Sequence, residues 1–154
     1  MKTRTKAKAL SGGFSLPELM VVLLVIAILA AVAYPSYRDA VLKTRRAEGL
    51  AALAKLMEQQ ERYYSVYGHY VAFSADATEP EAQHFKWYSG EAPAASFYEI
   101  EGRACDGESL RDCIALSAYP GTARVRAAYR DPRCGTLALD SRGRRSADGA
   151  RCWP

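Results

Sequence analysis

Several features that would indicate an enzyme or a metal centre are missing from this sequence. It has no phosphate-binding glycine loop, no nucleophile motif and no pair of carboxylates spaced for acid–base catalysis. It also has no C-x-x-C motif, and neither of its two histidines lies near a cysteine, which argues against a zinc site. We therefore predict that the chain is not an enzyme and needs no cofactor or metal.

Charge of either sign is missing from residues 19–34, LMVVLLVIAILAAVAY. Acidic residues are missing from residues 1–13, which contain four cations, Lys2, Arg4, Lys6 and Lys8. Removing these four from the 21 Lys and Arg leaves 17, equal to the 17 Asp and Glu, so the rest of the chain is neutral. A basic segment ahead of an apolar run tends to stay on the cytoplasmic side of a membrane.

Lysine is missing from Glu101 to the end of the chain, where ten arginines stand against seven acidic residues. Three of these arginines, Arg142, Arg144 and Arg145, lie close together near the C-terminus. Arginine suits bidentate contact with phosphate. One hypothesis is therefore that this turn contacts the phosphates of DNA, and the alternative is an ordinary solvated loop.

The cysteines are few and all lie in the second half of the chain, at Cys105, Cys113, Cys134 and Cys152. An even number in a short exported domain indicates disulfides, and four cysteines allow three pairings. We favour the pairs that are local in sequence, Cys105–Cys113 and Cys134–Cys152. On the chain-entropy estimate the second pair stabilises the fold by about 3 kcal/mol.

The apolar run has three interpretations when it is read alone. It could be a signal peptide cleaved after Ala33, a single-span anchor somewhat short for a bilayer, or a helix that waits in the membrane and later packs against copies of itself. Glu18 favours the third interpretation, because a carboxylate in an apolar setting needs a partner. The free amine of a chain cleaved before Phe14 would supply that partner.

The stretch Gly13-Phe14-Ser15-Leu16-Pro17-Glu18, followed by the apolar run, resembles the processing site of the type IV pilin family. The resemblance implies that a prepilin peptidase cuts between Gly13 and Phe14 and that Phe14 is then N-methylated. It implies a role for Glu18 in assembly. Pro17 stands where many pilins carry an aliphatic residue, and proline is tolerated in the first turn of a helix.

A long helix should continue beyond the apolar run. Pro35 is expected to kink or loosen it, because proline removes a helical hydrogen bond, and the family resemblance implies a bend there. Residues 36–64 have an amphipathic pattern, with Gly49 as a weak point of about 1 kcal/mol. The residues expected on the apolar stripe are Tyr37, Val41, Ala47, Leu50, Ala51, Ala54, Met57 and Tyr64.

The second half of the chain predicts short strands over residues 97–101, 113–119 and 135–140, and residues 123–129 could form a fourth strand or a helical turn. We expect an α+β type IV pilin fold, in which the amphipathic half of the helix packs on a small antiparallel sheet of 3–4 strands, closed by a C-terminal disulfide loop. The expected divisions are a leader over 1–13, an assembly helix over 14–35 and a periplasmic domain over 36–154.

The tyrosine-rich helix exit and the Cys-Trp ending resemble minor pilins of the PilE-like class. The resemblance implies a pilus subunit with roles in assembly, twitching motility, adhesion and DNA uptake. Its partners would be other pilin subunits, the prepilin peptidase and methyltransferase, and the inner-membrane assembly machinery. It would begin as a single-pass inner-membrane precursor and end in an extracellular pilus. The alternatives are a type II secretion pseudopilin, a DNA-binding pilin-like protein and a soluble periplasmic protein.

Overall fold

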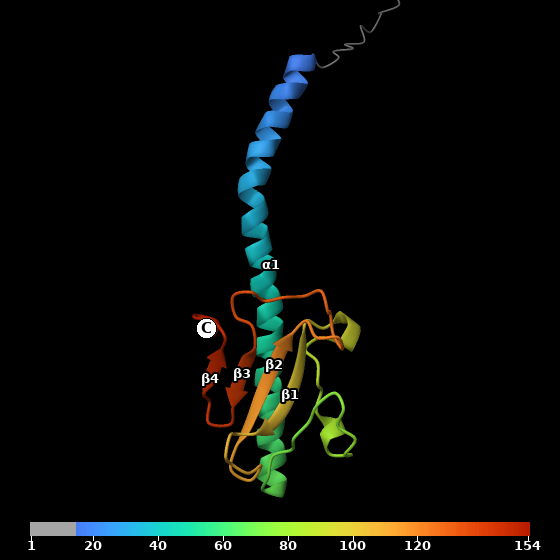
Figure 1. Cartoon of the computed structure of the whole chain (residues 1–154), viewed down its shortest axis with the longest axis vertical. Coiled ribbons are helices and arrows are strands. Elements are labelled where there is room, and N and C mark those ends of the chain that lie inside the picture. The colour runs from blue at the N-terminus through green and yellow to red at the C-terminus, as the bar shows by residue number, and fades with distance from the viewer. Residues whose placement is uncertain (1–14) are drawn as a thin grey trace, which may run out of the picture. The chain divides into compact units, whose positions relative to one another are not determined.

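A computed structural model of the chain describes residues 15–154. The predicted cleavage junction, Gly13 and Phe14, lies outside these residues. One long helix, α1 (Leu16–Tyr67), precedes a sheet of four strands, and two short 3-10 helices, η1 (Ala82–His84) and η2 (Pro93–Ala95), lie in the connection between them (Figure 1). The chain forms two compact units, which divide between Ala40 and Val41.

The first turn of α1 contains Pro17 and Glu18. Proline fits there because its missing amide hydrogen would have no helical partner, and a carboxylate there interacts favourably with the helix dipole. The helix then passes through Pro35 without interruption, so a break between an anchor and a domain is absent. The neighbouring helical turns hold the chain in helical geometry across this proline.

The second half of α1 buries one face against the sheet. Its buried residues are Arg46, Gly49, Ala52, Leu53, Leu56, Met57 and Gln60. The predicted stripe was partly wrong, because Ala47, Ala51 and Ala54 are exposed. The pattern was misplaced because alanines were counted as apolar contacts, whereas the true face includes the polar Arg46 and Gln60.

The four strands form one antiparallel sheet in the order β1-β2-β3-β4, with β1 at Tyr98–Ala104, β2 at Ile114–Pro120, β3 at Leu137–Asp140 and β4 at Arg145–Ala147. This confirms the predicted architecture and places three of the strands near their predicted positions. The fourth strand is Arg145–Ala147, whereas residues 123–129 form turns. The core lies between α1 and the sheet, and Leu53, Tyr98 and Leu116 are fully buried in it.

The long connection between α1 and β1 packs along the outer edge of β1. Isolated bridges join Phe73 to Gly102 and Tyr88 to Glu99. Inside the domain, the side chain of Gln60 donates to the carbonyl of Val71 at 2.7 Å and accepts from its amide at 2.9 Å. The buried Gln60 side chain therefore pairs with the backbone of Val71 as a neighbouring strand would.

Candidate assembly helix and nucleic-acid interface

The N-terminal part of α1 is a candidate assembly surface. Its apolar window is long enough to cross a membrane, with a mean hydropathy of 2.7, and none of that window is buried in the protein. Large apolar side chains such as Leu23 and Ile26 are more than half exposed. Glu18, at the start of this surface, is also exposed. A bare apolar helix of this kind requires lipid or other helices around it.

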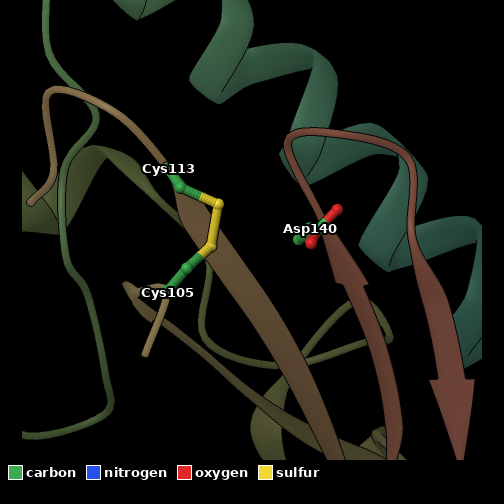
Figure 2. Close-up of side chains that lie close together, drawn as sticks. All are labelled: Cys105, Cys113 and Asp140. Carbon is green, nitrogen blue, oxygen red and sulfur yellow. A yellow bond between two sulfur atoms is a disulfide. The ribbon is translucent and has the colours of Figure 1, made fainter. Parts of the chain in front are cut away.

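Two disulfides are present, Cys105–Cys113 and Cys134–Cys152, and the second closes the predicted C-terminal loop. Figure 2 shows Asp140 at the end of β3 beside the first disulfide. The two sulfur atoms are bonded to each other, and the Asp140 carboxylate accepts hydrogen bonds from the amides of Arg142 and Arg144 and from the Arg144 side chain. The Asp140 carboxylate therefore holds the turn between β3 and β4 in place.

The three arginines predicted to contact phosphate lie on that turn or on β4. Arg142 forms an ion pair with Glu108, and Arg144 forms one with Asp140. The Arg145 guanidinium lies 5.4 Å from the centre of the Trp153 ring. All three arginine side chains remain exposed, whereas the partner carboxylate of Arg142 is half-buried and that of Arg144 is buried. Contact with phosphate stays a prediction for these residues.

A buried ion pair fastens the connection between β2 and β3 to the helix. Arg46 donates two hydrogen bonds to Asp131, Nε to Oδ2 at 2.8 Å and Nη2 to Oδ1 at 2.7 Å. The Tyr98 hydroxyl donates to the same carboxylate at 3.0 Å, and the amide of Cys134 donates to it at 3.1 Å. The pair therefore links α1, β1 and the start of the C-terminal disulfide loop.

Each charge in this network favours its ionised form. Burial acts to raise the pKa of Asp131, but the hydrogen bonds from Arg46, the Cys134 amide and Tyr98 outweigh it and leave that pKa lowered. The hydrogen bond with Asp131 raises the pKa of Arg46. Burial, followed by the contact with Tyr129, raises the pKa of Tyr98. The network is therefore an ion pair with a neutral tyrosine at neutral pH.

A second group of arginines lies on the same connection, residues 121–136, which crosses α1 near β3 (Figure 1). Arg124 is neutralised by Asp76 and Glu99. Arg130 donates to the carbonyls of Gly121, Ala127 and Tyr129. Arg126 instead stacks on Phe97, 5.0 Å from the ring centre. Within this one segment, Arg124 is therefore paired with carboxylates and Arg130 with carbonyls, whereas Arg126 contacts an aromatic ring.

Sequence reasoning missed both arginine groups outside the C-terminal turn. Arg46 and Asp131 are 85 positions apart, and no local pattern connects them. The stacking of Arg126 on Phe97 likewise joins two segments that are not adjacent in sequence. One signal was available, because Arg46 has the helical spacing of the buried Gly49, Leu53 and Gln60.

A groove of about 620 Å³ lies between the segment 69–74 and β1. Glu79, Glu81 and Glu101 line it together with Arg103 and the backbone of Gly102. Its three glutamates make it unsuitable for nucleic acid, so the candidate nucleic-acid interface consists of the exposed arginines of the 121–136 connection and of the turn from β3 to β4.

The solved structures that are similar to this chain include two pilins. One, described as a type IV pilin from Shewanella oneidensis, is 25% identical, with a TM-score of 0.47 over 73% of this chain and 98% of that one. The other is the non-core minor pilin PilV of Neisseria meningitidis, 16% identical, with a TM-score of 0.45 over 73% of this chain and 91% of that one.

Two family models also match the sequence. Residues 8–34 match the prokaryotic N-terminal methylation motif, which contains the predicted junction and Glu18. Residues 35–138 match the family described as "Type IV minor pilin ComP, DNA uptake sequence receptor". The second match spans about two thirds of the sequence and includes the amphipathic half of α1, strands β1 and β2 and the start of β3. This chain therefore belongs to the ComP family of type IV minor pilins.

Proposed function

We propose that this chain is a pilus subunit that binds DNA during its uptake into the cell. The observation that carries the proposal is the match of residues 35–138 to a family of DNA uptake sequence receptors. The arginine-only second half of the chain supports it, because guanidinium groups bind phosphate oxygens well. Arg142, Arg144 and Arg145 are exposed and are one candidate site of phosphate contact.

The proposal includes a route into the filament. A peptidase cuts between Gly13 and Phe14, a methyl group is added to the Phe14 amine, and Glu18 pairs with the amine of a neighbouring subunit. The exposed apolar face of α1 then packs against other pilin subunits instead of inner-membrane lipid. The partners on this route are the peptidase, the methyltransferase and the inner-membrane assembly machinery, and the end point is a pilus outside the cell.

The intact mass of the subunit recovered from sheared pili tests the processing step. We expect a chain that begins at Phe14 and carries one added methyl group. A chain that begins at Tyr34 would instead indicate cleavage as a signal peptide after Ala33. Glu18→Ala should still be cleaved but should be missing from pili, because the buried amine would lose its partner. Normal incorporation of this variant would contradict the charge-pair role of Glu18.

DNA binding is tested with the full chain in neutral detergent and a fluorescent double-stranded oligonucleotide. We expect binding that weakens steeply with salt, as for any ligand that neutralises phosphates. The triple variant Arg142→Ala, Arg144→Ala, Arg145→Ala should bind more weakly. A variant with the same change of charge elsewhere, Lys55→Ala, Arg62→Ala, Lys86→Ala, is the control. Equal loss in both variants would show that only net charge matters.

A further inference from the structure

Two arginines contact the ring of Phe97, and among the described residues neither has an acidic partner. The guanidinium carbon of Arg45 lies 4.6 Å from the centre of the Phe97 ring, and that of Arg126 lies 5.0 Å from the same centre. Arg45 is also 5.7 Å from the centre of the Tyr129 ring, which packs edge-on against Phe97. Within residues 15–154, neither guanidinium forms an ion pair with a carboxylate.

The position of this pair is fixed by its surroundings. Arg45 precedes Arg46, whose buried bond to Asp131 holds that part of α1 against the connection. The amide of Arg126 donates to the carbonyl of Ser96 at 3.0 Å, which ties the second arginine to the residue before Phe97. Tyr129 is buried and packs edge-on against Phe97. Both cations are therefore held against the ring of Phe97.

We propose that Arg45 and Arg126, stacked on Phe97, form a binding site for phosphate groups of the DNA backbone. The inference rests on the proposed function. Two like charges held against one ring repel each other, and phosphates bound to them reduce that repulsion. Stacking on the ring leaves the edges of each guanidinium, where its N–H donors lie, free to meet phosphate oxygens. The site is separate from Arg142, Arg144 and Arg145.

A further exposed arginine of the connection 121–136 favours DNA over a small anion as the ligand. The connection 121–136 also carries Arg133, which is exposed and forms no ion pair within the described residues. A polymer with a regular series of phosphates can contact several arginines of one surface, whereas a single small anion cannot. No base-specific contact is needed, because phosphate contacts position a protein on DNA without reading its sequence.

The test uses the full chain in neutral detergent, a fluorescent double-stranded oligonucleotide and a series of salt concentrations. Arg126→Gln should weaken binding several-fold and should reduce the slope of log K against log salt by about 0.9, the value for one lost phosphate contact. Arg45→Gln should do the same, and the double variant should lose about twice that slope. Arg126→Lys should keep the slope but bind more weakly, because it keeps the charge and loses the planar stack.

Arg124→Gln is the matched control, since it removes an arginine of the same connection whose charge is already neutralised by Asp76 and Glu99. It should change neither affinity nor slope appreciably. Equal behaviour of Arg126→Gln and Arg124→Gln in a wild-type background that binds DNA would overturn the site and leave the proposed function standing. If the wild-type chain binds no DNA, the proposed function fails and the site with it.

An anionic membrane lipid is the competing occupant. Mass spectrometry of the detergent-solubilised chain would detect co-purified phosphatidylglycerol. If Arg126→Gln loses that lipid but binds DNA as tightly as wild type, the site serves the membrane and the proposal is wrong. If Arg126→Gln loses DNA affinity with its lipid content unchanged, the proposal is supported. Arg126 is exposed, so its substitution should leave the fold intact.

Discussion

Gly49 on α1 lies directly under the ring of Tyr98 on β1. A Cβ atom placed on Gly49 would be 2.8 Å from Cδ2 and 3.0 Å from Cε2 of that ring, which is too close for two carbon atoms. The tyrosine is fully buried and its hydroxyl bonds to Asp131, so the ring has little freedom to move. The glycine therefore allows the helix to approach the sheet.

Gly49→Ala should destabilise the domain by about 1–2 kcal/mol, although alanine favours helix, because overpacking of the core outweighs helix propensity. The measurement is the urea midpoint of unfolding. Ala47→Gly, at an exposed site of the same helix, should cost about 1 kcal/mol from propensity alone. A rise in stability for Gly49→Ala would show that the ring can move aside.

Arg46→Met should destabilise the domain by about 3–5 kcal/mol, because it leaves the buried carboxylate of Asp131 without its cation. Adding Asp131→Leu should recover part of the loss by removing the unpaired charge. Arg45→Met is the neighbouring control and should cost less than about 1 kcal/mol, since the Arg45 guanidinium leaves no buried charge unpaired and only stacks on the rings of Phe97 and Tyr129. Similar losses for Arg46→Met and Arg45→Met would contradict the importance of the buried pair.

Stability should fall as the pH is lowered below about 4. The pKa values of Asp131 and Asp140 are lower in the folded state than in the unfolded chain. As the pH falls below about 4, the unfolded chain therefore binds protons first, and this stabilises it relative to the folded state. Above the ordinary aspartate pKa of about 3.9 the stabilisation is fully present. Thermal unfolding over a pH series measures this. Asp140→Asn should reduce the loss of stability at acid pH. An unchanged pH dependence in this variant would show that Asp140 does not contribute to that loss.

Gln60→Leu should destabilise by about 2–3 kcal/mol, because both the amide and the carbonyl of Val71 lose their partner in a buried site. Gln59→Leu, one position earlier on the exposed face, should change stability by less than about 0.5 kcal/mol. Hydrogen exchange at the Val71 amide gives an independent measurement. Faster exchange in Gln60→Leu alone is the expected result. Equal protection in both variants would argue against the importance of the hydrogen bonds between Gln60 and Val71.

Much of this architecture could be predicted because its signals are local. The apolar run, the amphipathic helix and three of the four strands each occupy one continuous stretch. The fourth strand was missed because Arg145–Ala147 contains no β-branched or aromatic residue and resembles a turn. It is a strand because its pairing with β3 and the packing of Trp153 hold it in place.

The candidate site was less predictable because its contacts join distant segments. Neither Arg46 nor Asp131 was among the predicted site residues. Their pairing depends on where the connection 121–136 crosses the helix, which no spacing in the sequence reveals. The same holds for Arg45 and Arg126, which are brought together only by their contacts with the ring of Phe97.

The covering of β1 by the segment around Phe73 and Tyr88 has a consequence for how copies of the protein associate. An open strand edge recruits strands from other chains and leads to aggregation. Here one edge of the sheet is occupied along its length, and the other is a strand of only three residues, with Trp153 bonded to the carbonyl of Ser146. Strand exchange between subunits is thereby disfavoured, so crowded copies can be stored side by side and added to a filament without their sheets merging.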